Sequence, residues 1–441
     1  MPNLANAPPV EGRRPQPPNR KVEERKDGKS MNVLGLKCFE CGFEIEERQM
    51  EYLCSRCGKN LEVVYDYNAI KKKISRQGFE KNQDFSIWRY RDFYPLKNLD
   101  FRIPLQIGWT SLYQARKLAN SFGMEKVWIK DDSRLPSASF KDRASAVSIA
   151  KGLEFGFKTI CGASTGNAAS STACLCASLG ISPVIFVPES APKAKIAQLL
   201  IFGAKVFAVK GSYDQAFDLC IEVSKKYNWY NRNTGYNPYT REGKKNCSYE
   251  ICEQLGWKVP DIVFVPVGDG NILTGIWKGF KDFYNAGLID SLPRIVAVQS
   301  EGSSAVADAV LGDGKIYPVK ANTIADSISV DYPRDGEKAV KAVHESGGTA
   351  VKVTDEEILE AIKLLARKEG VFAEPAGVAS VAGLRKMVLT GKIKKNEKVV
   401  CLITGNGLKD ISSALRICGE PVVLDPDPLE VEKEIRKLGI I

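Results

Sequence analysis

The chain has 441 residues, of which 44% are hydrophobic and 26% are charged, a globular composition long enough for two or three domains. No stretch approaches the roughly 18 uninterrupted apolar residues of a membrane span, and the N-terminus has no apolar signal region, so we expect a cytoplasmic protein rather than a membrane or secreted one. The net charge is +10, but basic residues interleave with acidic ones and no basic stripe carries aromatic side chains, so nucleic-acid binding is not expected.

Residues 1–30 contain Pro-Pro pairs and many charges, with almost no aromatic or β-branched residues. Such a segment buries too little apolar surface to offset the entropy of ordering it, so we predict a disordered, basic, proline-rich tail. Residues 1–29 hold seven Lys/Arg against four Asp/Glu, so part of the positive net charge belongs to this tail.

Two Cys-x2-Cys pairs come next, Cys38 with Cys41 and Cys54 with Cys57, separated by twelve residues. Each pair brings two thiolates together, and four thiolates complete a tetrahedral Zn²⁺ site. We therefore predict a zinc ribbon at residues 31–66. Because sulfur fills all four coordination positions, the metal would be structural rather than catalytic. Four free cysteines are the alternative, and disulfides are not expected in a cytoplasmic chain.

From about residue 125, short β-branched runs alternate with longer runs that have helical periodicity. This alternation predicts an α/β fold of parallel sheets with helices on both faces, where ligands gather at the carboxyl ends of strands. Strands are expected at residues 126–130, 159–163, 183–188, 205–210, 262–267, 294–299 and 398–404. Helices are expected at residues 167–179, 193–202, 213–226, 272–285, 355–369 and 376–390.

Lys141 lies in the sequence Ser-Phe-Lys-Asp-Arg, between the first of these strands and a helical run that begins near Ala144. A lone lysine is most often a solvated surface charge. At the first turn of a helix, however, unpaired N–H groups carry partial positive charge, which favours the neutral amine that attacks carbonyl groups. Lys141 is therefore a candidate imine-forming residue.

Three further segments directly follow predicted strands, and each could hold part of a small anionic ligand. Residues 164–167, Ser-Thr-Gly-Asn, open a helix whose free N–H groups suit a carboxylate or phenolate, with an ordinary helix cap as the alternative. Residues 268–271, Gly-Asp-Gly-Asn, let the backbone approach a phosphate, without the pattern of a dinucleotide fingerprint or a P-loop. Residues 404–407, Thr-Gly-Asn-Gly, indicate backbone close to something flat or bulky. Plain turns would explain the last two segments without a ligand.

His344 is the only histidine of the chain and lies at the expected end of a helix. We therefore expect neither Ser-His-Asp chemistry nor a metal site with several histidine ligands. The proton transfers of an enzyme would fall to lysine, carboxylates, hydroxyls or a cofactor.

The four segments, in this order and spacing, resemble the fold type II family of pyridoxal phosphate enzymes, and within it the threonine synthases, over about residues 85–420. The resemblance implies a tryptophan synthase β-like architecture of two doubly wound parallel-sheet subdomains. The catalytic domain would span residues 67–441, with a smaller subdomain, about residues 136–235, inserted in the larger one. An N-terminal zinc ribbon occurs in some relatives.

The resemblance also implies that pyridoxal 5′-phosphate is the cofactor and that Lys141 forms the imine with it. Asn167 would lie beside the cofactor's phenolic oxygen, and Thr404 would face its pyridine nitrogen. The residues implied for cofactor binding are Lys141, Asn167, Gly268, Asp269, Gly270, Asn271 and Thr404. Those implied for substrate binding are Ser164, Thr165 and Asn237.

The chain departs from the family pattern at several positions. Asn406 stands where histidine is usual, and Ser137-Ala138 where Thr-Gly is common. Thr240 occupies the position of an arginine that would grip the substrate phosphate, and Arg241 comes one place later. Asp269 inside the phosphate loop is unfavourable unless its side chain turns away or caps the next helix.

For a threonine synthase the resemblance implies loss of phosphate from O-phospho-L-homoserine, followed by addition of water at the β-carbon. The substrate would be a small amino-acid phosphate, and the resemblance is compatible with a homodimer. A serine/threonine ammonia-lyase, or another β-eliminating or β-replacing enzyme with the same cofactor, is the alternative, since it needs no site for a substrate phosphate. The remote second alternative is a nucleic-acid-binding or regulatory protein that acts through its zinc ribbon.

Overall fold

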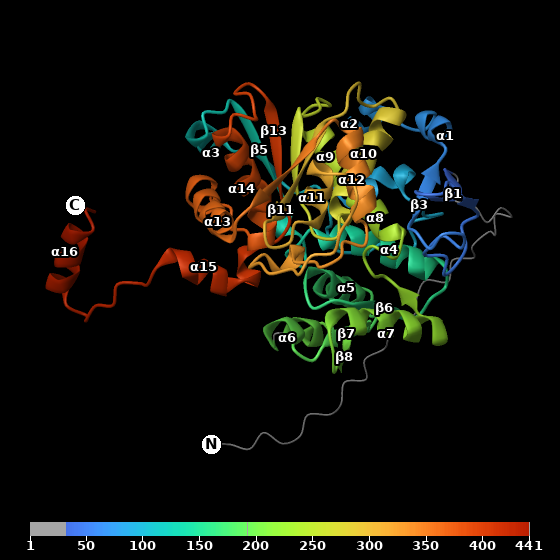
Figure 1. The fold of residues 1–441 in the computed structure, drawn as a ribbon, viewed down its shortest axis with the longest axis horizontal. Helices are drawn as coiled ribbons and strands as arrows, with labels where there is room; N and C mark the ends of the chain where they lie inside the picture. Colours follow the sequence, from blue (N-terminus) through green and yellow to red (C-terminus); the bar gives the residue numbers. More distant parts are fainter. Residues whose placement is uncertain (1–31, 192, 441) are drawn as a thin grey trace, which may run out of the picture.

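The structure, a computed structural model, describes residues 32–191 and 193–440. Three sheets organise the fold, an N-terminal antiparallel sheet and two larger sheets that each belong to an α/β layer (Figure 1). The predicted tail at residues 1–30 lies outside the described residues. Within the described part of the chain, no helix is long and apolar enough to cross a membrane.

The N-terminal sheet has the strand order β2-β1-β3 and is antiparallel. Its strands are β1 (Val33–Cys38), β2 (Glu44–Ile45) and β3 (Leu61–Tyr65). Along β3 the side chains of Leu61, Val63 and Tyr65 are buried in the main core, so this face of the sheet is fixed to the rest of the chain. We call residues 32–66 the ribbon.

The largest sheet has the order β12-β11-β10-β13-β5-β4, and its strands are parallel except for β4, which is antiparallel to β5. All five residues of the inner strand β10 are buried, as expected of a parallel strand covered on both faces. Four of these strands match the predictions, while β4 and β12 were not predicted. The strands are β4 (Leu112–Gln114), β5 (Lys126–Asp131), β10 (Ile262–Pro266), β11 (Arg294–Ser300), β12 (Thr349–Val353) and β13 (Lys398–Ile403).

The second parallel sheet has the order β8-β7-β6-β9. Figure 1 shows it below the large sheet, together with α5, α6 and α7. Three of its strands were predicted, but the two-residue strand β9 was not. The strands are β6 (Ile160–Ala163), β7 (Val184–Pro188), β8 (Lys205–Val209) and β9 (Tyr230–Asn231).

The helices cover the faces of both parallel sheets, and α4 lies between the two layers in Figure 1. The six predicted helices are confirmed to within one residue at each end. The α-helices are α1 (Tyr67–Lys71), α2 (Arg76–Lys81), α3 (Arg116–Ser121), α4 (Lys141–Glu154), α5 (Asn167–Ser178), α6 (Lys193–Ile201), α7 (Tyr213–Lys226), α8 (Tyr239–Lys244), α9 (Asn246–Gln254), α10 (Asn271–Asn285), α11 (Ala305–Leu311), α12 (Gly336–Glu345), α13 (Asp355–Glu369), α14 (Pro375–Leu389), α15 (Ile411–Cys418) and α16 (Pro428–Lys437). The short 3-10 helices are η1 (Ile87–Phe93), η2 (Asp132–Arg134), η3 (Asp326–Ile328) and η4 (Gly407–Lys409).

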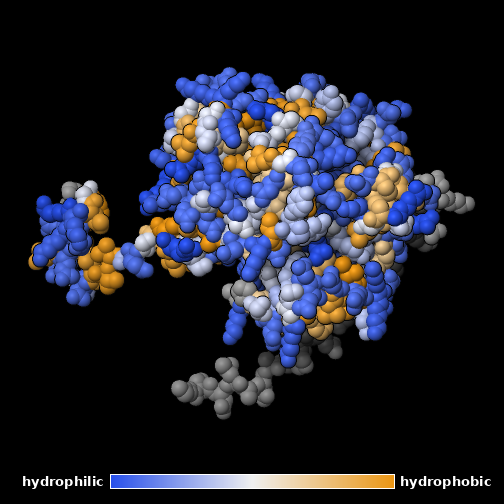
Figure 2. Space-filling view, viewed as in Figure 1, coloured by the Kyte–Doolittle hydropathy of each residue, from blue (hydrophilic) through white to orange (hydrophobic). Residues whose placement is uncertain are grey.

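The C-terminal helix α16 stands apart from the rest of the molecule in Figure 1, and none of its residues is buried. Figure 2 shows hydrophobic side chains on this arm, where Leu429, Leu438 and Ile440 are exposed. Helix α16 therefore contributes no buried side chain to the core.

Candidate active site

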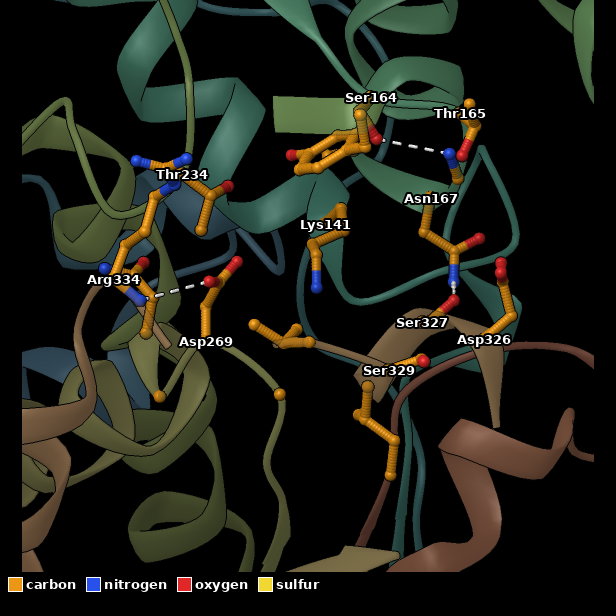
Figure 3. A pocket seen from close by; sticks show the side chains of 18 of the residues that line it. Lys141, Ser164, Thr165, Asn167, Thr234, Asp269, Asp326, Ser327, Ser329 and Arg334 are labelled. Carbon is orange, nitrogen blue, oxygen red and sulfur yellow. Dashed lines mark hydrogen bonds between the residues drawn. The ribbon is translucent and has the colours of Figure 1, made fainter. Parts of the chain in front are cut away.

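A cavity of about 400 Å³ collects three of the four segments singled out in the sequence (Figure 3). Its lining includes Lys141, the loop at residues 164–167 after β6, and the loop at residues 268–271 after β10. The carboxyl ends of strands from both parallel sheets thus face the same space, as α/β folds place their ligands. Thr404 and Asn237, which were also predicted for the site, are not among its lining residues.

Lys141 lies in the first turn of α4, as predicted, although the helix begins at Lys141 itself and not near Ala144. Figure 3 shows its amino group pointing into the cavity. Burial lowers the pKa of the Lys141 amine, and nearby Arg232 acts in the same direction, whereas the carboxylates of Asp269 and Glu374 oppose the change. A larger share of neutral amine makes this lysine a better nucleophile toward a carbonyl group.

The start of α4 is held by Thr404 and its neighbours, which follow β13 directly. The Phe140 amide donates to the Thr404 carbonyl oxygen at 2.9 Å, and the Asn406 amide donates to the Ala138 carbonyl oxygen at 3.1 Å. A side chain at Gly407 would collide with the ring of Phe372. The ring of Phe372 is therefore a flat group beside this segment, where the sequence predicted one. Through its carbonyl oxygen, Thr404 therefore positions the backbone before Lys141.

A buried ion network holds α4 from behind. The Arg143 guanidinium donates to Asp132 at 2.6 and 2.8 Å and to Glu250 at 2.6 and 2.9 Å, and Lys130 lies 2.6 Å from Glu250. Burial alone would raise the pKa of Glu250, but Arg143 and Lys130 lower it to about 2. These charges are mutually neutralised, so the network fixes the helix and leaves no charge for a ligand.

In the loop at residues 164–167, Asn167 begins α5 and its side chain connects two other segments. The Asn167 amide donates to Glu374 at 2.7 Å and to the Ser327 hydroxyl at 3.2 Å. Ser164 and Thr165 line the cavity beside it. Burial raises the pKa of Glu374, and Lys409 and the hydrogen bond from Asn167 oppose that rise. The contact of Glu374 with Asn167 was not predicted from the sequence.

The loop at residues 268–271 has a conformation that depends on glycine. Gly270 has φ +89°, in the left-handed region, and a Cβ there would lie 2.9 Å from the Asp335 carbonyl oxygen. Asp269 neither turns away nor caps α10; its carboxylate accepts from the Arg334 amide at 3.3 Å and faces the cavity (Figure 3). Burial raises the pKa of Asp269.

Two buried cations at the cavity, Arg232 and Lys244, were missed in the sequence. Arg232 is 2% exposed; it donates to the Ser145 hydroxyl at 3.0 Å, and its Nε has no partner in the described part of the chain. Burial lowers the pKa of Arg232 to about 10. The Lys244 ammonium donates to the Asn271 side chain, and burial, Lys141 and Arg232 lower its pKa. Neither cation forms an ion pair with any residue the structure describes.

Two buried cations that have no ion-pair partner among the described residues fit a ligand with more than one anionic group. An isolated buried charge is costly, and anions that enter the cavity would remove this cost. Arg232 follows the short strand β9, so a strand-end position was the signal in the sequence. The strand itself is too short to be detected from periodicity.

The predicted substrate residue Asn237 lies outside the cavity. Its amide donates to the Asn231 carbonyl oxygen at 2.8 Å, and its side-chain oxygen accepts from the Tyr239 amide at 2.8 Å. Arg241 also points elsewhere, because it pairs with Asp335 at 2.6 Å. Thr234 instead lines the cavity, and its hydroxyl is buried without a hydrogen-bond partner among the described residues.

In the ribbon the four predicted metal-binding cysteines come together. The sulfur atoms of Cys38, Cys41, Cys54 and Cys57 all lie within 4.8 Å of one another. Cys38 and Cys57 are 3.4 Å apart, and Cys41 and Cys54 are 3.6 Å apart. This spacing of four thiols suits a single tetrahedral ion.

The chain matches known proteins over most of its length. Residues 103–405 match the model of the family described as pyridoxal-phosphate dependent enzyme. A threonine synthase of Methanocaldococcus jannaschii is 40% identical over 91% of this chain and 99% of that protein. A threonine synthase of Methanosarcina acetivorans is 40% identical over 88% of this chain and 96% of that protein.

Solved structures show the same fold at lower identity. The processed form of threonine deaminase isoform 2 from Solanum lycopersicum aligns with a TM-score of 0.61, at 24% identity over 70% of this chain and 87% of that one. Maize serine racemase aligns with a TM-score of 0.60, at 20% identity over 75% of this chain and 93% of that one. Both confirm the predicted α/β architecture of two parallel-sheet layers.

Proposed function

The chain belongs to the threonine synthases, within the pyridoxal-phosphate dependent enzyme family, and we propose that it converts O-phospho-L-homoserine and water to L-threonine and phosphate. The observation that carries this proposal is a pair of buried cations, Arg232 and Lys244, which line the cavity that contains Lys141 and have no ion-pair partner among the described residues. A cofactor phosphate and a substrate phosphate would together supply anionic partners for these two cations.

The residues at the cavity fit pyridoxal phosphate, which when bound supplies the electron sink for chemistry at the amino-acid carbons. Lys141 would hold the cofactor covalently. Residues 268–271 and Lys244 would hold its phosphate, and Asn167, oriented by Glu374, would donate to its phenolic oxygen. Asp269 would remain bonded to the Arg334 amide at the edge of the phosphate site. The role of Thr404 at the ring nitrogen stays a prediction.

On the substrate side, the cavity offers separate groups for a carboxylate and a phosphate. Ser164 and Thr165, at the N-terminus of α5, would bind the carboxylate. Arg232 and Thr234 would bind the phosphate, since both carry buried polar atoms without a partner among the described residues. They would thus take the place of the arginine that the family pattern puts at Thr240. A contact between Asn237 and the substrate stays a prediction.

Lys141 would also move protons between neighbouring carbons of the substrate. Its lowered pKa favours the neutral amine, which is the form that accepts a proton from carbon. The Asp269 and Glu374 carboxylates stabilise the ammonium form and so allow the proton to be carried and returned.

We also propose that Cys38, Cys41, Cys54 and Cys57 bind one structural Zn²⁺. Metal analysis of the purified protein should find about one zinc per chain, a count set by the four thiolates of a single tetrahedral site. The domain limits of residues 31–66 for the ribbon and about 136–235 for the smaller subdomain, a homodimer and a cytoplasmic location stay predictions.

The proposed reaction is tested with purified protein, pyridoxal phosphate and O-phospho-L-homoserine. Phosphate and L-threonine should appear in equal amounts. Release of ammonia and a 2-oxo acid from threonine, without turnover of O-phospho-L-homoserine, would refute the proposal in favour of an ammonia-lyase.

A further inference from the structure

The ribbon rests directly on the segment that supports the loop at residues 268–271. Asn60 lies three positions after Cys57, and its side-chain amide donates to the Arg334 carbonyl oxygen at 3.0 Å and to the Asp335 carboxylate at 2.9 Å. Ion pairs flank this contact on both sides: Lys59 lies 2.7 Å from Glu337, and Lys338 pairs with Glu62.

Arg334 and Asp335 in turn hold the loop that we assign to the cofactor phosphate. The Asp335 amide donates to the Asp269 carbonyl oxygen at 3.0 Å, and the Arg334 amide donates to the Asp269 carboxylate at 3.3 Å. The Asp335 carboxylate accepts from Asn271 at 2.9 Å and from the Thr274 hydroxyl at 2.6 Å. One buried carboxylate therefore joins the loop, the start of α10 and the ribbon.

Arg241 provides a second connection between Asp335 and the ribbon. Its guanidinium lies 2.6 Å from Asp335 and donates to the Leu61 carbonyl oxygen at 3.2 Å. Asp335 is buried, so its hydrogen bonds are strong, and water cannot replace a partner that is lost. A shift of the turn between Cys57 and Leu61 would thus reach the phosphate loop in two steps.

We propose that metal binding by the four cysteines fixes Asn60 and, through Asp335, holds residues 268–271 in the conformation that binds the cofactor phosphate. Metal occupancy and cofactor affinity are then coupled, and Asn60 is a positioning residue for the cofactor. Because such coupling is reciprocal, bound cofactor should also slow the loss of the metal. The inference concerns cofactor binding and does not depend on the identity of the substrate.

The test is a titration of the cofactor-free, metal-loaded full chain with pyridoxal phosphate. Binding is measured from the absorption band of the bound cofactor. Asn60→Ala should raise the dissociation constant about tenfold, the effect expected of losing a hydrogen bond to a buried charge. Glu44→Gln is the matched control, because it removes only an exposed ribbon ion pair with Lys37 and should leave the constant unchanged.

Metal-stripped wild-type protein should show a similar loss of affinity, and Asn60→Ala should add little to it, since the connection is already broken. Bound cofactor should slow zinc release to a chelator in the wild type and much less in Asn60→Ala, an effect that a merely structural asparagine would not produce. If stripping the metal unfolds the chain, as circular dichroism would reveal, the metal-loaded Asn60→Ala decides. A dissociation constant equal to that of the wild type would overturn the proposal.

Discussion

Replacing Arg232 by methionine separates ligand binding from folding. The side chain is buried, donates one hydrogen bond to Ser145 and has an unpartnered Nε among the described residues. If Arg232 binds the substrate phosphate, Arg232→Met should weaken catalysis without lowering the free energy of unfolding of the ligand-free protein. If the charge of Arg232 instead stabilises the fold, the variant should be less stable and should retain its catalytic activity.

The size of both effects follows from the environment of this guanidinium. Burial lowers the pKa of Arg232 from its ordinary value to about 10, a fall that corresponds to about 3 kcal/mol of unfavourable free energy for the charged form. Loss of the bond to Ser145 costs about 1 kcal/mol, and Ser145 keeps its bond from Ser171. The ligand-free variant should therefore be at least as stable as the wild type. Loss of a charged hydrogen bond to phosphate should lower kcat/KM at least about tenfold.

The assays are chemical unfolding of the cofactor-free protein and steady-state kinetics with O-phospho-L-homoserine. The control is Arg143→Met, which leaves the buried carboxylates of Asp132 and Glu250 without this partner and should destabilise the fold by about 3–5 kcal/mol. An Arg232→Met variant that is destabilised to a similar degree, with kcat/KM unchanged, would refute the assignment of Arg232 to the substrate phosphate.

Two further predictions concern Lys141 and Glu250. Lys141→Ala should retain the fold but lose the covalent cofactor and all turnover. Borohydride reduction would fix any covalently bound cofactor to the chain, and mass spectrometry would detect the added mass. Finding that mass on Lys141→Ala would contradict the assigned role of Lys141. Glu250 has a folded pKa of about 2 against 4.5 ordinarily, so it contributes about 3 kcal/mol of stability above pH 4.5, which is lost as the pH falls toward 2. The gap in unfolding free energy between the wild type and Glu250→Gln should narrow over that interval in denaturant titrations, and a constant gap would contradict this account.

Much of the fold could be predicted because its signals are local. Strands such as β10 are runs of apolar residues, and helices such as α13 have a Thr354 cap with Glu357 three residues on. The strands β4 and β9 have three and two residues, too few for any periodicity to appear. Strand β12 is mostly half-buried, so its apolar pattern is weak.

The site could be predicted where a residue follows a recognisable strand, and not where its role depends on distant partners. Lys141 and residues 164–167 and 268–271 have such positions. The contact of Glu374 with Asn167 joins residues 207 positions apart, and that of Asn60 with Asp335 joins residues 275 positions apart. No local pattern encodes these pairs, since they arise only when the two layers and the ribbon are assembled.

The neutralisation of buried charge distinguishes the cavity from the rest of the core. Away from the cavity, buried cations are matched: Arg143 and Lys130 share Glu250, and Lys245 lies 2.7 Å from both Glu242 and Asp282. At the cavity, Arg232 and Lys244 have no ion-pair partner among the described residues. Burying an unpaired charge costs several kcal/mol, so a fold tolerates it only where something else supplies the counter-charge. Both of these cations belong to the lining that contains Lys141, so this cavity is where an anionic ligand would supply the counter-charge.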